Sequence, residues 1–336
     1  MHIHHRPQPS RLRAAPVAAL LALGIIGLVP GTASAADLAG QTDLIRPTGG
    51  VIRSIQTAFD SGADDIDTGD ITNDGFDEIL VANAGGSSEN GRVDVLDAFG
   101  FTISSFGTAY DDRGDALAAG DITNDGAEEV LIANAGGSGE NGRVDVLDLF
   151  GFTISSFGTA YDDEGDTIAV GDITGDGAED IVIANDEGGG RMDVVDLFGA
   201  TIASFGNTGY DGDDTVDVGD ITGDGRAEIV VANTEGGGRV DVYGGTGGLL
   251  SRFSTGIDYP LVRVDEMTGD PFEEIAVVGR VGQTNLPVGV LDFFGVRITT
   301  LGTTFTPALT PNRVGDGFAL GQLNGDARAE VVVANV

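Results

Sequence analysis

Four short turns in this chain are dense in oxygen-bearing side chains. Residues 70–75 and 121–126 read DITNDG, and residues 172–177 and 220–225 read DITGDG. Counted from the first Asp, side-chain oxygens fall at positions 1, 3, 5 and 9, a glycine at position 6 permits a sharp turn, and position 7 offers its backbone carbonyl. The four sets are Asp70, Thr72, Asp74, Phe76 and Glu78; Asp121, Thr123, Asp125, Ala127 and Glu129; Asp172, Thr174, Asp176, Ala178 and Asp180; and Asp220, Thr222, Asp224, Arg226 and Glu228.

This spacing is typical of loops that bind a hard cation. Three carboxylates held close together repel one another unless a cation or protons lie between them. Ca²⁺ accepts six to eight oxygen ligands in flexible geometry, and the EF-hand loop uses similarly spaced oxygen ligands around a glycine. We therefore predict about four Ca²⁺ sites. The alternative is that each turn only closes a hairpin through side-chain-to-backbone hydrogen bonds.

Two further copies of the turn are degenerate. EMTGDPFEE begins at Glu266 and has Pro271 in place of the glycine, and QLNGDARAE begins at Gln322 and has Ala327 there. We expect calcium to bind these two turns weakly or not at all.

The composition excludes several other chemistries. The chain has no Cys, Lys or Trp, and its only histidines are His2, His4 and His5. Beyond those three residues, the chain therefore lacks the side chains for Ser-His-Asp and Cys-His systems, lysine Schiff bases and His or Cys zinc sites. The formal net charge of −37 repels nucleic acid and suits cations.

Residues 1–36 are predicted to be a secretory signal peptide. They contain three arginines and no acid, then the apolar run VAALLALGIIGLV at 17–29 and the small residues TASAA at 32–36. The apolar run of 13 residues is short for a membrane span. We expect cleavage near Ala35 or Ala36, secretion, and no membrane insertion afterwards; an uncleaved anchor is the alternative.

The acid turns belong to a longer repeat. GFTISSFGTAYDD at 100–112 recurs unchanged at 151–163, and the turns start about fifty residues apart. In each unit a short segment enters the turn, and a continuous β-branched run leaves it. A Gly-rich loop, an alternating segment such as RVDVLD (143–148) and a last segment such as FTISSFG (152–158) follow. Four predicted strands per unit without helical periodicity are typical of propeller blades. We expect the second strand to be buried on both faces and the third to be half exposed.

The ends of the chain carry complementary strand pairs. Segments 42–45 and 51–55 match the last two strands of a unit, whereas 317–323 and 329–335 match the first two. Together they would complete a blade by a two-plus-two strand exchange between the termini and close the ring. The prediction is therefore an all-β protein whose single domain, 37–336, is a six-bladed β-propeller. An open β-solenoid is the weaker alternative.

The units resemble FG-GAP repeats, the integrin α-type repeats that are also called VCBS-like. SFG at 105–107, GDITNDGAEE at 120–129 and IANAGG at 132–137 follow the order of that family's pattern, and the likeness covers nearly all of 37–336. The resemblance implies a β-propeller with calcium in these turns that serves adhesion or ligand binding outside the cell. Thr at position 3 and Glu at position 9 depart from the pattern, which should lower calcium affinity without abolishing binding.

Three further residue types recur among the units. An arginine opens the alternating strand, and we expect it to pair with a nearby Asp rather than to form a cationic ring for acidic glycans; these are Arg92, Arg143, Arg191 and Arg239. A tyrosine precedes the first strand and is expected to pack between blades rather than to stack on sugars; these are Tyr110, Tyr161 and Tyr210. A phenylalanine precedes glycine at the last turn and is interpreted as a hairpin and core anchor; these are Phe99, Phe150 and Phe198.

These observations favour a non-enzymatic extracellular binding or adhesion module, expected to be monomeric, with a glycan or a protein as partner. The rival is a polysaccharide-active enzyme, a lyase or glycosidase, that uses carboxylates or Tyr on one propeller face. Catalytic residues should interrupt the repeat, so a specific site is expected in the unmatched segments 257–263, 280–287 and 303–316. A purely structural surface protein is a third interpretation, and the residues do not select one ligand.

Overall fold

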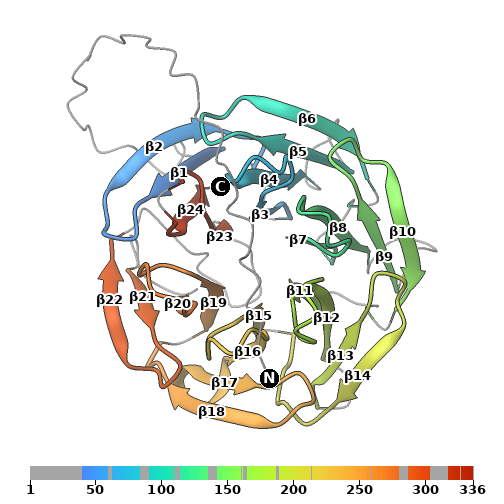
Figure 1. Ribbon diagram of the computed structural model, residues 1–336. Helices are drawn as coiled ribbons and strands as arrows, with labels where there is room; N and C mark the ends of the chain where they lie inside the picture. Colours follow the sequence, from blue (N-terminus) through green and yellow to red (C-terminus); the bar gives the residue numbers. More distant parts are fainter. Residues whose placement is uncertain are drawn as a thin grey trace, which may run out of the picture.

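A computed structural model describes residues 40–335, apart from 60–62, 84–90, 109, 111–113, 135–141, 160, 162–164, 187–188, 213, 258, 280–286, 303–316 and 326. Within these residues, 24 strands form six four-stranded antiparallel sheets around a central axis (Figure 1). The prediction of a six-bladed β-propeller is therefore confirmed. The predicted signal peptide, 1–36, lies outside the described residues. Across the described part of the chain, no helix has the length and apolar character needed to cross a membrane.

Each blade runs from an inner strand at the axis to an outer strand at the rim. The first blade comprises β3 (Asp65–Gly69), β4 (Glu78–Asn83), β5 (Arg92–Leu96) and β6 (Thr102–Gly107). The second comprises β7 (Ala116–Gly120), β8 (Glu129–Asn134), β9 (Arg143–Leu147) and β10 (Thr153–Gly158). The third comprises β11 (Thr167–Gly171), β12 (Asp180–Asn185), β13 (Arg191–Val195) and β14 (Thr201–Phe205). The fourth comprises β15 (Thr215–Gly219), β16 (Glu228–Asn233), the short helix α1 (Glu235–Gly238), β17 (Arg239–Tyr243) and β18 (Leu249–Ser254). The fifth comprises β19 (Pro260–Asp265), β20 (Glu274–Gly279), β21 (Val288–Leu291) and β22 (Arg297–Leu301).

The sixth blade is built from both ends of the described chain. β23 (Gly317–Gly321) and β24 (Glu330–Asn335) supply its inner half, and β1 (Gln41–Ile45) and β2 (Val51–Gln56) supply its outer half. β1 pairs antiparallel with β24, and Figure 1 shows these blue and red strands side by side. The inner strands also contact one another around the axis, including β19 with β23 and β23 with β3. Pairing between the two halves covers the edges that each would otherwise leave open.

The hydrophobic core lies between the blades. Among the described residues, six clusters of buried side chains each combine two neighbouring sheets. The second strand of the first five blades is buried along its whole length, as predicted, because both of its faces contact neighbouring blades. The third strand is also largely buried, which corrects the expectation of a half-exposed strand. Its Asp94, Asp193 and Asp241 are nearly inaccessible and each pairs with an arginine.

The recurrent tyrosines join consecutive blades, as predicted. Tyr110, Tyr161 and Tyr210 are at most 3% exposed. Each hydroxyl donates to a backbone carbonyl just before the inner strand of the preceding blade, at 2.6–3.0 Å: Tyr110 to Ala63, Tyr161 to Gly114 and Tyr210 to Gly165. Burial raises the pKa of Tyr110 and Tyr161 well above the usual range. Because the rings are inaccessible, they offer no stacking surface to a sugar.

The phenylalanine before glycine in the outer turns is exposed, which corrects its interpretation as a core anchor. Phe99, Phe150 and Phe198 are 59%, 65% and 73% exposed. The glycine makes the contact between blades instead. Gly151 has a φ of +77°, and a Cβ built on it would lie 2.5 Å from ring carbons of Phe106, at the end of β6 in the preceding blade. Glycine is therefore favoured at this position for two reasons: the positive φ is strained for other residues, and any side chain would clash with the Phe106 ring.

Candidate metal site

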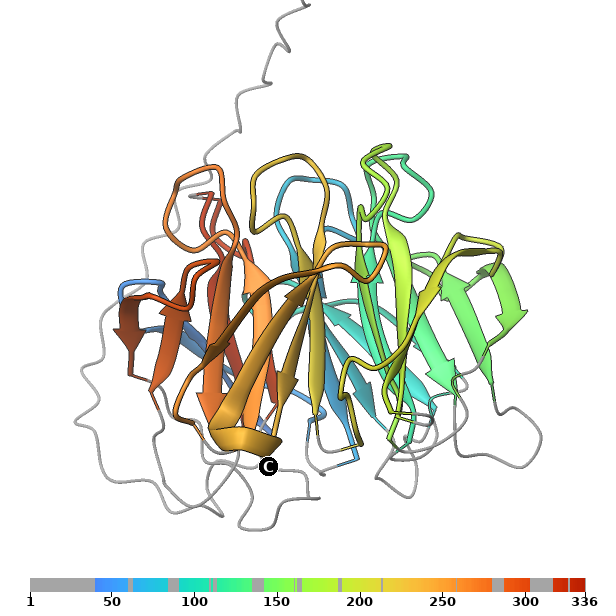
Figure 2. The same cartoon turned by 90° about the horizontal axis from the view of Figure 1, so that it is seen from below.

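The four acid turns lie at one end of the propeller. Each joins the first and second strands of a blade, and in an antiparallel sheet that turn lies at the same end as the one between the third and fourth strands. Figure 2, turned by 90° from Figure 1, shows turns projecting together above the strands, with α1 at the opposite end. The acid turns near the axis and the Phe-Gly turns at the rim therefore share one face of the molecule.

In the first turn every carboxylate accepts hydrogen bonds from the turn itself. Asp70 Oδ1 accepts from the Asp74 N–H and Oδ2 from the N–H of the following glycine, each at 2.9 Å. Asp74 Oδ1 accepts from the Phe76 N–H at 3.0 Å. Glu78 accepts from the Thr72 N–H at 3.0 Å and from the Thr72 hydroxyl at 3.3 Å. Positions 1, 5 and 9, which the spacing selected, thus hold the turn together.

The other three turns repeat this pattern with one exception. Position 1 accepts from the N–H groups of positions 5 and 6 in the turns that begin at Asp121, Asp172 and Asp220. Position 9 accepts from the backbone and the hydroxyl of position 3 in the second and fourth turns. In the third turn Asp180 is one methylene shorter than Glu. It accepts the Thr174 N–H at 3.0 Å, and the buried Thr174 hydroxyl oxygen has no hydrogen-bond partner among the described residues.

The three carboxylates of each turn differ in exposure. In the first turn Glu78 is 4% exposed, Asp70 is half-buried and Asp74 is exposed. Burial, together with the charges of Asp74 and Asp70, raises the pKa of Glu78 to about 7. In the other three turns, burial and the charges of the aspartates at positions 5 and 1 of the same turn also raise the pKa of the position-9 acid. Each turn therefore holds a buried carboxylate within electrostatic reach of two others.

The oxygen atoms of each turn are of the kind that binds a hard cation, although they are not gathered around one point. Among the described residues, no group of three His, Cys, Asp or Glu side chains is arranged as metal ligands. A carboxylate oxygen that accepts one hydrogen bond still has a lone pair for a cation. The unpartnered hydroxyl of Thr174 is a neutral oxygen ligand that the third turn does not otherwise use. Calcium is the ion that such a mixture of carboxylate, hydroxyl and carbonyl oxygens suits best.

The fifth turn keeps part of this arrangement. The Thr268 hydroxyl donates to Glu274 at 3.0 Å, as in the intact turns. Glu266 at position 1, however, accepts from the N–H groups of Thr268 and Gly269, because Pro271 at position 6 has no N–H to donate. In the sixth turn Asp326 lies outside the described residues. Weak or absent calcium binding in these two turns stays a prediction.

A second group of acids, which the sequence analysis missed, lines a cavity of about 310 Å³ on the propeller axis. Burial raises the pKa of Asp67, Glu179 and Glu273 to about 7. Besides Arg263, the described lining residues include the carboxylates of Asp65, Asp67, Asp77, Glu128, Glu179, Asp217, Asp265 and Glu273. Of the segments that break the repeat, 257–263 leads into β19 and supplies Arg263, whereas 303–316 and 280–286 lie outside the described residues.

Three of the axial acids that lie on inner strands satisfy backbone groups of a neighbouring blade. An inner strand is the edge of its sheet, so the N–H groups that point away from the sheet at this edge have no partner within it. Asp65 and Asp67 of β3 accept from two N–H groups of β7, at 3.1 and 3.0 Å, and Asp217 of β15 accepts from one of β19 at 2.6 Å. Two sequence patterns could have indicated these axial acids: the alternation of Asp in DIDTG (65–69) and the doubled acids after the first three turns.

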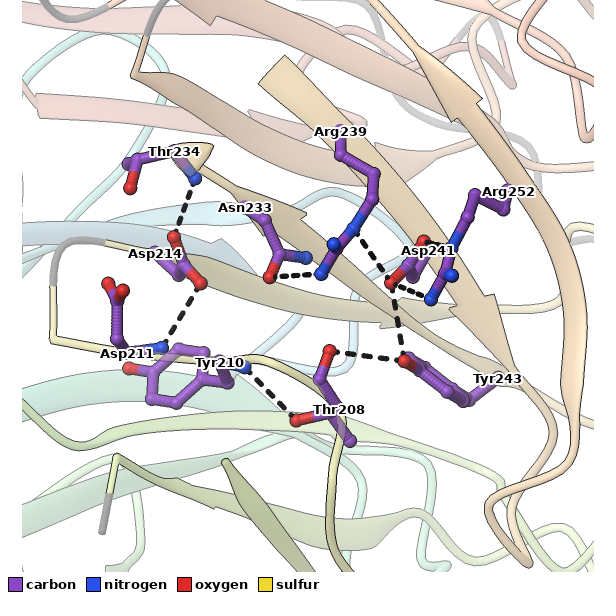
Figure 3. A network of polar contacts seen from close by, with 10 residues as sticks. All are labelled: Thr208, Tyr210, Asp211, Asp214, Asn233, Thr234, Arg239, Asp241, Tyr243 and Arg252. Atoms are coloured by element: carbon purple, nitrogen blue, oxygen red, sulfur yellow. Dashed lines mark hydrogen bonds and ion pairs between the residues drawn. The ribbon is translucent and has the colours of Figure 1, made fainter. Parts of the chain in front are cut away.

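The recurrent arginines pair with aspartates two residues along the same strand, as predicted. A nitrogen of Arg92 lies 2.7 Å from Asp94, and the pairing recurs in the next three blades. Figure 3 shows the network of the fourth blade. The fully buried Asp241 contacts Arg239 at 3.1 Å, accepts from Arg252 at 2.5 and 2.7 Å, and accepts from the Tyr243 hydroxyl at 3.3 Å. These guanidinium groups therefore serve ion pairs within the blades.

Comparison with known proteins shows likeness in fold only. No protein-family model and no curated protein matches the chain. A protein of unknown function from Bacteroides caccae is 11% identical, with a TM-score of 0.46 over 72% of this chain and 78% of that one. A lectin from Agrocybe aegerita that recognises non-reducing terminal N-acetylglucosamine is 15% identical, with a TM-score of 0.44 over 88% and 84%. BBS1N, solved in complex with ARL6DN, is 12% identical, with a TM-score of 0.48 over 89% and 98%.

Proposed function

We propose that this protein is a secreted, calcium-stabilised propeller of the FG-GAP type that binds a glycan or a protein outside the cell. The observation that carries the proposal is the repetition of two features on one face, an acid turn near the axis and an exposed apolar turn at the rim. Features that recur blade after blade suit a partner that is contacted at several points. A reaction centre, in contrast, needs one unrepeated set of residues.

Calcium would be held by positions 1, 3, 5 and 9 and the carbonyl of position 7 in the turns that begin at Asp70, Asp121, Asp172 and Asp220. A divalent cation would offset the repulsion among the three carboxylates of a turn, and it would stabilise only the folded chain. Extracellular modules often have a Kd of roughly 10⁻⁴–10⁻³ M. At a calcium concentration of about ten times Kd, each site would stabilise the fold by about 1.4 kcal/mol.

The partner would contact the rim of the same face. Six phenylalanines there are 59–73% exposed: Phe99, Phe101, Phe150, Phe152, Phe198 and Phe294. Exposed apolar residues gathered on one surface mark interaction sites. A second copy of so acidic a chain would be repelled, so we expect a monomer whose rim is open to a glycan or a protein.

Calorimetry tests the calcium part of the proposal. We expect about four bound Ca²⁺ ions, one fewer after Asp125→Ala, and a lower melting temperature in chelator that calcium restores better than magnesium. A melting temperature that ignores the chelator, with no heat of calcium binding, would show that the turns only close hairpins.

A glycan and protein array tests the binding part. The double change Phe150→Ser and Phe152→Ser should weaken capture of the array ligand, because it removes one of several contact points. The melting temperature should stay within about 2 °C, because surface changes cost little stability. Phe106 is half-buried and packs against the next blade, so a conservative Phe106→Leu change should leave capture intact. Unaltered capture by the double variant would place the partner elsewhere.

The second candidate is a polysaccharide-active enzyme, and the axial cavity favours it. Glu179 and Glu273 line the cavity with pKa values of about 7, a range suited to general acid and base catalysis at neutral pH. Both carboxylates accept backbone N–H groups of the preceding blade, from Asp121 and Asp220, which accounts for their placement without a substrate. Release of sugars from acidic polysaccharides that disappears in Glu179→Gln would favour the enzyme.

A further inference from the structure

Neighbouring acid turns are joined by backbone hydrogen bonds that run around the ring. At each boundary the N–H of position 8 donates to the carbonyl of position 1 in the preceding blade, as from Glu128 to Asp70 at 3.1 Å. The last of these bonds closes the ring, because the Asp77 N–H donates to the Gln322 carbonyl at 3.2 Å. The four links between them run from Glu179 to Asp121, Ala227 to Asp172, Glu273 to Asp220 and Ala329 to Glu266, at 2.7–3.3 Å.

At three of these six boundaries the position-8 side chain makes a second bond in the opposite direction. Its carboxylate accepts the backbone N–H of position 1 in the preceding turn. The pairs are Glu179 with Asp121 at 2.9 Å, Glu273 with Asp220 at 2.8 Å, and Asp77 with Gln322 at 2.6 Å. At a fourth boundary the Glu128 carboxylate lies beside Gly69, the residue before Asp70. Alanine stands at position 8 of the remaining two boundaries, so the turn that begins at Asp172 has no such carboxylate behind its first residue.

We propose that the position-8 carboxylates are positioning residues for the cation sites of the preceding blade, an inference that rests on the calcium proposal above. A hydrogen bond to a carboxylate is charge-assisted and stronger than one between neutral groups. With the backbone bond in the reverse direction, it fixes the two peptide groups that flank the first ligand, such as Asp121. Each site then takes its ligands from one blade and its support from the next.

Position 8 and position 9 have separate tasks in this arrangement. Position 9 is the first residue of the second strand and position 8 immediately precedes it, so the two side chains point to opposite faces. Asp180 accepts from Thr174 of its own turn, whereas Glu179 accepts from the Asp121 backbone of the preceding blade. A change at position 8 should therefore act on the neighbouring site and leave the site of its own blade intact.

The decisive experiment uses the full chain with the second turn, which begins at Asp121, as its one intact site, through the background changes Asp74→Ala, Asp176→Ala and Asp224→Ala. In this background Glu179→Ala should weaken calcium binding in calorimetry about tenfold or more, the usual effect of removing a group that orients a ligand. Glu179→Gln, which keeps an acceptor oxygen, should recover part of the loss. Glu273→Ala is the matched control, because it removes the same group behind the fourth turn, which is already disabled.

The otherwise unaltered chain provides a converse test that does not depend on folding of the multiple variant. Ala227→Glu adds the carboxylate behind Asp172 and should tighten one of the four sites about tenfold at unchanged stoichiometry. Equal losses from Glu179→Ala and Glu273→Ala would overturn the proposal, because they would indicate a general effect of charge. Failure of Ala227→Glu to tighten any site would overturn it as well. If neither the unaltered chain nor the background binds calcium, the calcium proposal itself fails, and this inference fails with it.

Discussion

A single methyl group on Gly151 should loosen the contact between the first two blades. The Gly151 φ of +77° costs an L-residue about 1–2 kcal/mol. A Cβ at this position would also lie 2.5 Å from two ring carbons of Phe106 and 2.8 Å from its Cβ, so the ring must move. Forcing extra atoms into a packed contact costs about 1–3 kcal/mol. Gly151→Ala should therefore destabilise the fold by about 2–5 kcal/mol, or lower the melting temperature by roughly 5–15 °C.

The sixth blade supplies a matched control for this change. Gly49 occupies the equivalent turn, with a φ of +83° and an N–H that donates to the Arg46 carbonyl at 2.8 Å, as Gly151 donates to Asp148. A Cβ on Gly49 meets no atom within 4 Å. Gly49→Ala should therefore show only the backbone cost of about 1–2 kcal/mol.

Thermal and denaturant unfolding at fixed calcium concentration would measure both variants. The difference between them isolates the contact with Phe106. Combining Gly151→Ala with Phe106→Ala should cost less than the sum of the single changes, because the ring that the methyl group strikes is gone. Equal destabilisation by the two glycine variants, or strict additivity in the double variant, would refute the packing explanation.

Three further predictions concern closure, ion pairing and pH. Deleting 40–56 removes β1 and β2 and exposes the edge of β24, so we expect aggregation or non-cooperative melting; a truncated protein that melts like the full chain would contradict the observed pairing. Asp241→Ala removes the shared acceptor of two arginines and a tyrosine and should cost about 1–3 kcal/mol in denaturant unfolding, more than Asp145→Ala with its single arginine. Burial raises the pKa of Asp67 from 3.8 to about 7 in the folded chain. Its protonation therefore favours the fold, and this stability is lost as pH rises through about 7. In chelator, the protein should melt higher near pH 5.5 than near pH 8, and Asp67→Asn should weaken that dependence.

The propeller was predictable because its determinants are local and repeated. The run from Glu129 to Asn134 is short, apolar and β-branched, and the structure buries all of it. The complementary strand pairs at the two ends could be recognised without knowing any contact, because each matches half of an internal unit. Register between blades is different, because it depends on residues that are about fifty positions apart.

The rim shows where local reasoning failed. Phe150 was interpreted as an anchor because large apolar residues are usually buried. The structure instead exposes it, and Phe106 of the preceding blade occupies the space over Gly151. Hydrophobicity alone could not distinguish the two phenylalanines, because their difference depends on which residues of the neighbouring blade lie beside each of them.

The acids show the same division between local and long-range information. Spacing identified Asp70, Asp74 and Glu78 because they close one turn. It did not identify Glu128 as a backbone partner of Asp70, although the doubled acid at 128–129 was visible. Assigning that partner requires knowing which blade lies next to which, and that follows only from the closed ring.

The concentration of acids around the axis has a physical reason that is independent of any ligand. A propeller places the inner edge of every sheet at its centre, where the N–H groups that point away from the sheet have no strand to pair with. Asp65, Asp67 and Asp217 provide acceptors for such groups across the boundaries between blades. Carboxylates are strong acceptors, but so many in one narrow cavity repel one another, and protons or cations must offset that repulsion. We therefore expect the geometry that closes the ring to make its stability depend on pH and on cations.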